Sequence, residues 1–152
     1  MSDFKIKSKN QKGFALIEIF LSLALLIILV GIGLPVSRHF YVKNTLNILT
    51  QNVAHYLRRA QIFSQVMSHD ATWGIYLSDN ELTFFKGADY ASRDTDFDEF
   101  VSVSPEITIS GIREVVFDKL TGLPQTTGTI TLTSSTNDTK EITINAHGIL
   151  SY

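Results

Sequence analysis

The longest feature of the hydropathy pattern is an apolar segment that covers residues 14–34. Its residues are apolar or small except Glu18 and Ser22. In a helix that rises about 1.5 Å per residue, roughly 20 such residues match the ~30 Å hydrocarbon core of a bilayer. The pattern therefore predicts a membrane-spanning helix over residues 14–35. Because a carboxylate inside such a helix costs about 2.5–3.5 kcal/mol, we expect Glu18 to have a partner or a function.

The helical pattern changes at Pro35, which follows Gly31 and Gly33. A proline removes one backbone hydrogen bond and clashes with the preceding turn, so we predict a helix kink at Pro35. Beyond it, apolar residues recur at spacings of three and four, which predicts an amphipathic helix with one buried face over residues 36–69. This face consists of Val42, Leu46, Leu49, Val53, Leu57, Ala60, Phe63 and Met67.

Short β-prone runs separated by turn-forming residues begin after His69. Residues 73–77 and 82–85 flank Ser78-Asp79-Asn80, which predicts a hairpin. Because no helix alternates with the strands, we expect antiparallel sheets. The predicted fold class is α+β, with a long N-terminal helix packed on a small antiparallel β-sandwich head over residues 70–152. The other predicted strands are 100–103, 106–110, 114–117, 129–133, 141–145 and 149–152, and a loop is predicted over 87–99.

The composition of the chain excludes several classes of function. The chain has 152 residues, a net charge of −2 and no cysteine. It therefore lacks the basic field that favours nucleic-acid binding, and it has no disulfide, thiolate metal site or thiol nucleophile. Four lysines precede the apolar segment, and such residues stay on the cytoplasmic side of a membrane. They are Lys5, Lys7, Lys9 and Lys12.

The N-terminal residues closely resemble the signature of type IV pilins and of the pseudopilins of type II secretion. Gly13-Phe14 follows the basic leader, Glu18 is the fifth residue after Gly13, and Pro35 lies near the end of the apolar helix. The resemblance implies that a prepilin peptidase removes residues 1–13 as a leader peptide and methylates Phe14. It also implies that Glu18 pairs with the N-terminal ammonium of a neighbouring subunit, an opposite charge that favours the ionised carboxylate.

The C-terminal region is similar to the minor pseudopilin H and FimT-like group. That similarity implies a long helix packed against two antiparallel sheets. It rests on Trp73-Gly74-Ile75-Tyr76, Phe85-Lys86-Gly87, Val116-Phe117, Gly122-Leu123-Pro124, Gly128-Thr129-Ile130-Thr131-Leu132 and Ile142-Thr143-Ile144-Asn145 to Gly148.

No residue set in the sequence indicates catalysis, so we predict that the chain is not an enzyme and needs no cofactor. The four histidines lack metal-pair spacing, and no serine stands in a nucleophile elbow. Asp94, Asp96 and Asp98 mimic the start of a calcium loop, and some pseudopilins bind calcium in a comparable loop. However, Glu99 and Pro105 replace the glycine and glutamate that an EF-hand needs. These three aspartates are weak metal candidates, and a solvated acidic loop is the favoured interpretation.

Aromatic residues near Lys86 and Arg93 suggest a second idea, stacking on single-stranded DNA or on a glycan. The acidic residues of the same loop would repel a phosphate backbone, so we favour core packing. The rings concerned are Trp73, Tyr76, Phe84, Phe85, Tyr90 and Phe97.

The sequence thus predicts a structural subunit, of the minor type, of a type IV pilus or a type II secretion pseudopilus. Its expected partners are other pilin or pseudopilin subunits, the prepilin peptidase and the inner-membrane assembly platform. It is expected to cross the inner membrane once, with the leader cytoplasmic and the head extracytoplasmic, and then to enter a filament. A filament-tip subunit that binds DNA or mediates adhesion is the alternative, and the choice between pilus and secretion system stays open.

Cleavage after Gly13 gives the first testable prediction. Because the resemblance implies a requirement for glycine before the cleavage site, Gly13→Val should leave the 13-residue leader attached. Mass spectrometry of membranes should then detect the full-length chain. A methylated Phe14 in that variant would contradict the assignment.

Overall fold

The computed structural model describes residues 12–152, with side chains at residues 16–31 and 38–152. Most of the leader peptide, residues 1–11, lies outside the described residues, as do the side chains of Phe14 and Pro35 and the surroundings of Gly13. The chain divides into two compact units, Met1–His39 and Phe40–Tyr152, which are described separately. Two helices are present in the described chain, α1 (Lys12–Gln65) and the short 3-10 helix η1 (Ser68–Asp70).

The described part of the first unit is helical throughout. Helix α1 is continuous through Pro35, and the kink expected there stays a prediction. Over residues 16–31 and 38–65, where the helix has described side chains, no segment is both long and apolar enough to cross a membrane. The predicted span over 14–35 includes residues 14, 15 and 32–35, whose side chains lie outside the described set, so the span stays a prediction.

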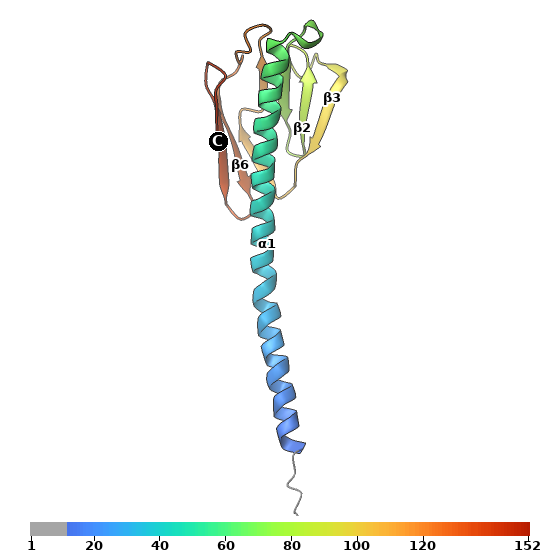
Figure 1. Cartoon of the computed structure of the whole chain (residues 1–152), viewed down its shortest axis with the longest axis vertical. Coiled ribbons are helices and arrows are strands. Elements are labelled where there is room, and N and C mark those ends of the chain that lie inside the picture. The colour runs from blue at the N-terminus through green and yellow to red at the C-terminus, as the bar shows by residue number, and fades with distance from the viewer. Residues whose placement is uncertain (1–11) are drawn as a thin grey trace, which may run out of the picture. The chain divides into compact units, whose positions relative to one another are not determined.

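In the second unit, α1 has the predicted amphipathic pattern. The face formed by Val42, Leu46, Leu49, Val53, Leu57 and Ala60 is buried, each residue being at most 4% exposed. Phe63 of the predicted face is partly buried against the core. Met67 is 42% exposed, because α1 ends at Gln65 and Met67 has a left-handed backbone with φ of 53°. The predicted helix therefore ends about one turn too late. Figure 1 shows this part of α1 running along the strands of the second unit.

The strands form two antiparallel sheets of four strands each, so the fold is α+β. The first sheet has the order β3-β2-β1-β5 and the second has the order β4-β6-β7-β8. Figure 1 labels β2 and β3 of the first sheet and β6 of the second. The predicted hairpin is confirmed, since Leu77 pairs with Leu82 across the turn. The bounds are β1 Trp73–Leu77, β2 Glu81–Lys86, β3 Asp94–Ser102, β4 Ile107–Gly111, β5 Glu114–Phe117, β6 Gly128–Ser134, β7 Thr139–Ile144 and β8 Leu150–Ser151.

Both sheets and the helix contribute to one hydrophobic core. Its largest members include Phe84 and Phe117 from the first sheet, Leu132 and Ile142 from the second, and Leu57 from α1, all with 0% exposure. Alternation along β6 buries every second residue from Ile130, as expected for a sheet with one face in the core. The helix therefore covers apolar side chains of both sheets.

The loop predicted over 87–99 is only partly correct. The loop ends at Arg93, and Asp94 begins β3, the longest strand of the described chain. Asp94 and Asp98 are tolerated in this strand because each pairs with a basic side chain. Lys86 lies 2.9 Å from Asp94 and Arg93 lies 2.8 Å from Asp98. The register between β2 and β3 also shifts between Phe84 and Lys86, which indicates a bulge.

Burial of the helix face gives the second testable prediction. Leu57→Ala should lower the free energy of unfolding by about 2–5 kcal/mol, because it leaves a cavity where α1 meets the core. Ile62, which is 53% exposed on the same helix, is the matched control. Ile62→Ala should change stability by about 0.5 kcal/mol or less. Urea unfolding of the detergent-solubilised chain, followed by fluorescence of the single tryptophan, tests both; equal losses would contradict this packing.

Candidate functional site

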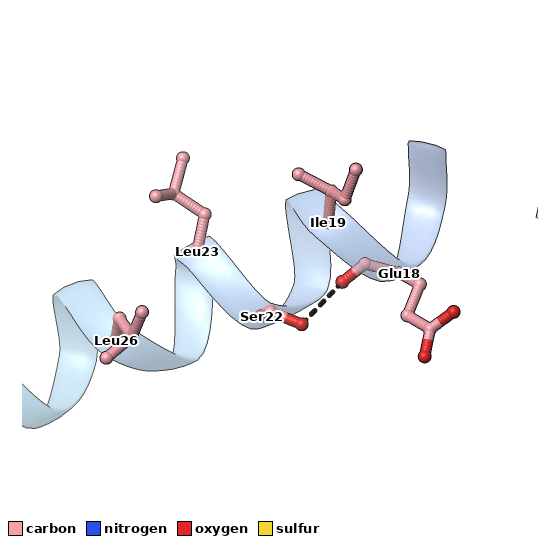
Figure 2. Close-up of a pocket in the computed structure, with 5 residues that line it drawn as sticks. All are labelled: Glu18, Ile19, Ser22, Leu23 and Leu26. Atoms are coloured by element: carbon pink, nitrogen blue, oxygen red, sulfur yellow. Dashed lines mark hydrogen bonds between the residues drawn. The ribbon is translucent and has the colours of Figure 1, made fainter. Parts of the chain in front are cut away.

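The apolar part of α1 carries one carboxylate, that of Glu18. Glu18 lies on a shallow groove of the helix surface with Ile19, Ser22, Leu23 and Leu26. Ser22 Oγ donates a hydrogen bond of 2.7 Å to the backbone carbonyl of Glu18, and Figure 2 shows the carboxylate directed away from this bond. No basic group among the described residues pairs with the carboxylate. The carboxylate of Glu18 is therefore available to a partner.

The side chains around Glu18 are apolar in every direction. Each large apolar residue from Leu16 to Val30 is at least 52% exposed, and Leu21 reaches 73%. A helix that is hydrophobic all round is normally covered, either by a protein core or by a membrane. In the described chain this segment has no cover of its own. Gly13 and Phe14, the predicted processing residues, lie in the first turn of α1.

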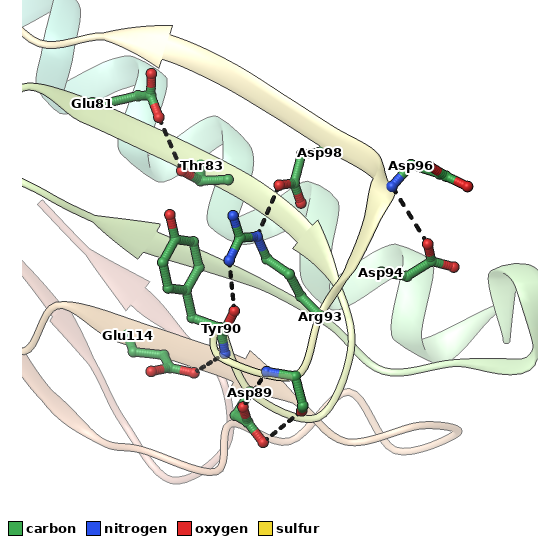
Figure 3. Close-up of polar contacts among 10 residues, drawn as sticks. Glu81, Thr83, Asp89, Tyr90, Arg93, Asp94, Asp96, Asp98 and Glu114 are labelled. Carbon is green, nitrogen blue, oxygen red and sulfur yellow. Dashed lines mark hydrogen bonds and ion pairs between the residues drawn. The ribbon is translucent and has the colours of Figure 1, made fainter.

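The loop between β2 and β3 folds over the outer face of the first sheet. Tyr90 stacks on Tyr76 with centroids 4.0 Å apart, and its backbone N–H donates to Glu114 at 2.8 Å. Arg93 donates from Nε to Asp98 and from Nη1 to the carbonyl of Tyr90, both at 2.8 Å (Figure 3). The side chain of Asp98 is 3% exposed, and its Oδ1 has no hydrogen-bond partner among the described atoms. This cluster fixes the loop to the sheet.

The three aspartates singled out as metal candidates each have a different environment. Asp94 pairs with Lys86, whose hydrogen bond lowers the pKa of the Asp94 carboxyl, and Asp98 pairs with Arg93. Asp96 is exposed. The structure therefore does not bring the three carboxylates together. Within residues 12–152, no three histidine, aspartate or glutamate side chains are placed to hold a metal ion.

A second groove lies between α1, η1 and β3, and sequence reasoning missed it. Its polar centre is Arg59, which donates two hydrogen bonds of 2.6 Å to the carboxylate of Glu99. Each partner stabilises the charged form of the other, so the pKa of Glu99 is lowered and that of Arg59 is raised. Forty residues separate the two, and no local pattern indicates the pair. The groove is lined by Arg59, Phe63, His69, Trp73, Asp96, Phe97, Asp98 and Glu99.

The rings near this groove pack against one another. Trp73 stacks on Phe84 at 5.1 Å, and both are at most 3% exposed. Phe97 contacts His69 at 4.7 Å and has Lys86 Nζ 4.0 Å from its centroid. Internal packing therefore occupies the rings considered for stacking on a nucleic acid or glycan, which supports the core-packing interpretation.

Comparisons of this chain with protein-family models, with curated proteins and with solved structures find no match. The candidate functional residues are therefore those that the sequence motif and the geometry single out. In the first unit this is Glu18 on the exposed apolar helix. In the second unit they are Arg59 and Glu99 in the groove between α1, η1 and β3.

The Arg59–Glu99 pair gives the third testable prediction. The pKa of Glu99 is lower in the folded state than in the unfolded state. The stabilisation of the fold by ionised Glu99 is therefore fully present above the unfolded-state pKa and is lost as the pH falls through the folded-state pKa. Since both side chains are partly exposed, at 29% and 43%, Glu99→Gln should cost only about 1 kcal/mol at pH 7. The difference from the unaltered chain should vanish well below about pH 4. Urea unfolding at pH 7 and pH 3 measures this difference in unfolding free energy. The control is Asp79→Asn, which removes the carboxylate of a more exposed ion pair with Arg113. A difference that grows in acid would contradict this assignment.

Proposed function

We propose that this chain is a structural subunit of a helical filament, of the type IV pilus or type II secretion pseudopilus kind. It enters the inner membrane as a precursor, is cleaved after Gly13 and then assembles with other subunits. The observation that carries the proposal is the carboxylate of Glu18, which has no partner among the described residues and lies on a segment of α1, residues 16–31, that is exposed and apolar on all sides. The N-terminal motif of Gly13, Phe14 and Glu18 supports the same function.

The apolar segment needs cover in two successive environments. Lipid can cover the side chains of residues 16–31 before assembly, and the same segments of neighbouring subunits can cover them afterwards. Neither environment favours a lone carboxylate, which remains charged in apolar surroundings only beside an opposite charge. Cleavage after Gly13 creates such a charge, the ammonium group of Phe14. A neighbouring subunit therefore supplies the partner that the described chain lacks.

The second unit is the head of the subunit in this proposal. Three of the rings considered for stacking, Trp73, Phe84 and Phe85, are buried, which weakens the alternative of a tip subunit that stacks on DNA or glycans. Its role is then to present charged and apolar surface to other heads in the filament.

Glu18→Gln gives the fourth testable prediction. Glutamine keeps the shape and one carbonyl oxygen but removes the charge, so the Phe14 ammonium of the adjacent subunit is left buried and unpaired. That loss should cost about 3–5 kcal/mol per contact. The variant should be inserted and cleaved normally but should be lost from sheared filaments, as measured by immunoblotting of the membrane and filament fractions.

Ser22→Ala is the matched control for this substitution. It removes the hydrogen bond from Ser22 Oγ to the Glu18 carbonyl, one turn away, and leaves the carboxylate unchanged. Filament levels of Ser22→Ala should equal those of the unaltered chain. Normal incorporation of Glu18→Gln would show that charge pairing at Glu18 does not recruit this subunit.

A further inference from the structure

The first sheet buries a second, smaller set of apolar side chains on its outer face, the face away from α1. Phe84 belongs to the core, and because side chains alternate along a strand, Phe85 points to the outer face. Val116 follows the core residue Val115 in the same way. Both outer residues are nevertheless buried, at 0% and 4% exposure. They meet above Gly74, where an added Cβ would lie 2.9 Å from the Phe85 ring and 3.0 Å from Val116. This outer cluster therefore needs a cover other than the helix.

The cover is the loop of residues 87–93, which is called the strap. The ring of Tyr90 stacks on Tyr76 with centroids 4.0 Å apart, and it meets the Phe85 ring edge-on at 5.7 Å. The backbone N–H of Tyr90 donates to Glu114 at 2.8 Å. One ring of the strap therefore lies over the outer cluster.

The two ends of the strap lie close together. Gly87 has φ of 151°, which glycine adopts without strain, and a Cβ added to it would lie 2.9 Å from the Cα of Arg93. Within the strap, the backbone N–H and the hydroxyl of Ser92 each donate to the Asp89 carboxylate at 2.8 Å. A loop with a narrow base and internal contacts is a compact unit. The strap can therefore swing away from the sheet without separating β2 from β3.

One ion pair latches the strap to the sheet. Arg93 Nε donates to Asp98 on β3 at 2.8 Å, and Figure 3 shows the guanidinium between the side chains of Tyr90 and Asp98. The buried Asp98 carboxylate uses only one oxygen, since its Oδ1 has no hydrogen-bond partner among the described atoms. The pair of Arg59 and Glu99, by contrast, satisfies both carboxylate oxygens. Because an unsatisfied buried oxygen favours any state in which water reaches it, the latch that holds the strap closed also carries a cost.

We propose that the strap is a lid that opens while α1 and the two sheets stay folded. In the closed state Tyr90 covers the outer cluster, and the pair of Arg93 and Asp98 holds it there. In the open state water hydrates both oxygens of Asp98, and Phe85 and Val116 become exposed apolar surface. Only contacts of the strap break, so this opening needs less free energy than unfolding of the core. The lid therefore controls whether the first sheet presents an apolar outer face, independently of filament assembly.

Cysteine labelling of the full-length, detergent-solubilised chain tests the lid. The sequence has no cysteine, so Val116→Cys reports exposure of the outer cluster, and Ile142→Cys, at 0% exposure in the core, reports exposure of the core. Iodoacetamide should alkylate Val116→Cys at least roughly tenfold faster than Ile142→Cys. Urea below the unfolding transition should accelerate labelling of Ile142→Cys steeply and that of Val116→Cys weakly, because the urea dependence scales with the surface exposed.

Two charge substitutions separate opening of the lid from unfolding of the core. Arg93→Gln removes the latch and should raise the labelling rate of Val116→Cys about tenfold. Glu99→Gln lies outside the strap and should raise the labelling rate of Ile142→Cys about fivefold. It should leave the rate of Val116→Cys within about twofold, because the pair of Arg59 and Glu99 stays intact when the lid opens.

Equal labelling rates with equal urea dependence at the two cysteines would overturn the lid, because the outer cluster would then be exposed only by global unfolding. A labelling rate of Val116→Cys that does not respond to Arg93→Gln would overturn the latch. Hydrogen exchange in the unaltered chain checks the lid without any substitution. The Tyr90 N–H should exchange faster than the N–H of Ile75, on a strand paired on both sides, and equal exchange would contradict the lid.

Discussion

Packing of the apolar stripe of α1 against both sheets is the interaction on which the second unit depends. Each four-stranded sheet buries one face, and the helix is needed to cover the apolar side chains of both faces. Leu57, at 0% exposure, is in the same core as Phe84 of one sheet and Ile142 of the other. The last turn of α1 is tied down as well, since Gln61 donates to the Gly122 carbonyl and Ser64 accepts from the Leu120 N–H. The helix therefore fixes where the sheet edges and their charges lie.

Much of this fold can be predicted from sequence because its signals are local. Apolar residues at spacings of three and four identify the amphipathic helix within one segment of sequence. The hairpin that joins Leu77 to Leu82 is likewise identified by turn-forming residues between two β-prone runs. The hydropathy pattern does not show where α1 ends, because Met67 keeps the apolar spacing of the helix although its backbone is left-handed. What ends the helix is the chain reversal into η1, which hydropathy does not report.

The other differences from the sequence prediction involve side-chain pairs that hydropathy does not report. A run with Asp94, Asp96 and Asp98 has a loop-like composition, and only the neighbouring Lys86 and Arg93 side chains make it acceptable as a strand. The pair of Arg59 and Glu99 has no sequence signal at all. Glu18, by contrast, has a local signal, since one carboxylate in an apolar run is anomalous whatever the tertiary structure.

The two units satisfy their polar groups in different ways. In the second unit most charged side chains have partners inside the chain, and the few that do not, such as Asp96 and Lys43, are exposed to water, where a lone charge costs little. Among residues 16–31 of the first unit the single charged group, Glu18, lies amid exposed apolar residues that water does not favour. Whatever covers those residues also removes water from Glu18. The requirement for a cover and the requirement for a counter-charge therefore arise together, and one neighbouring subunit with a free N-terminal ammonium meets both.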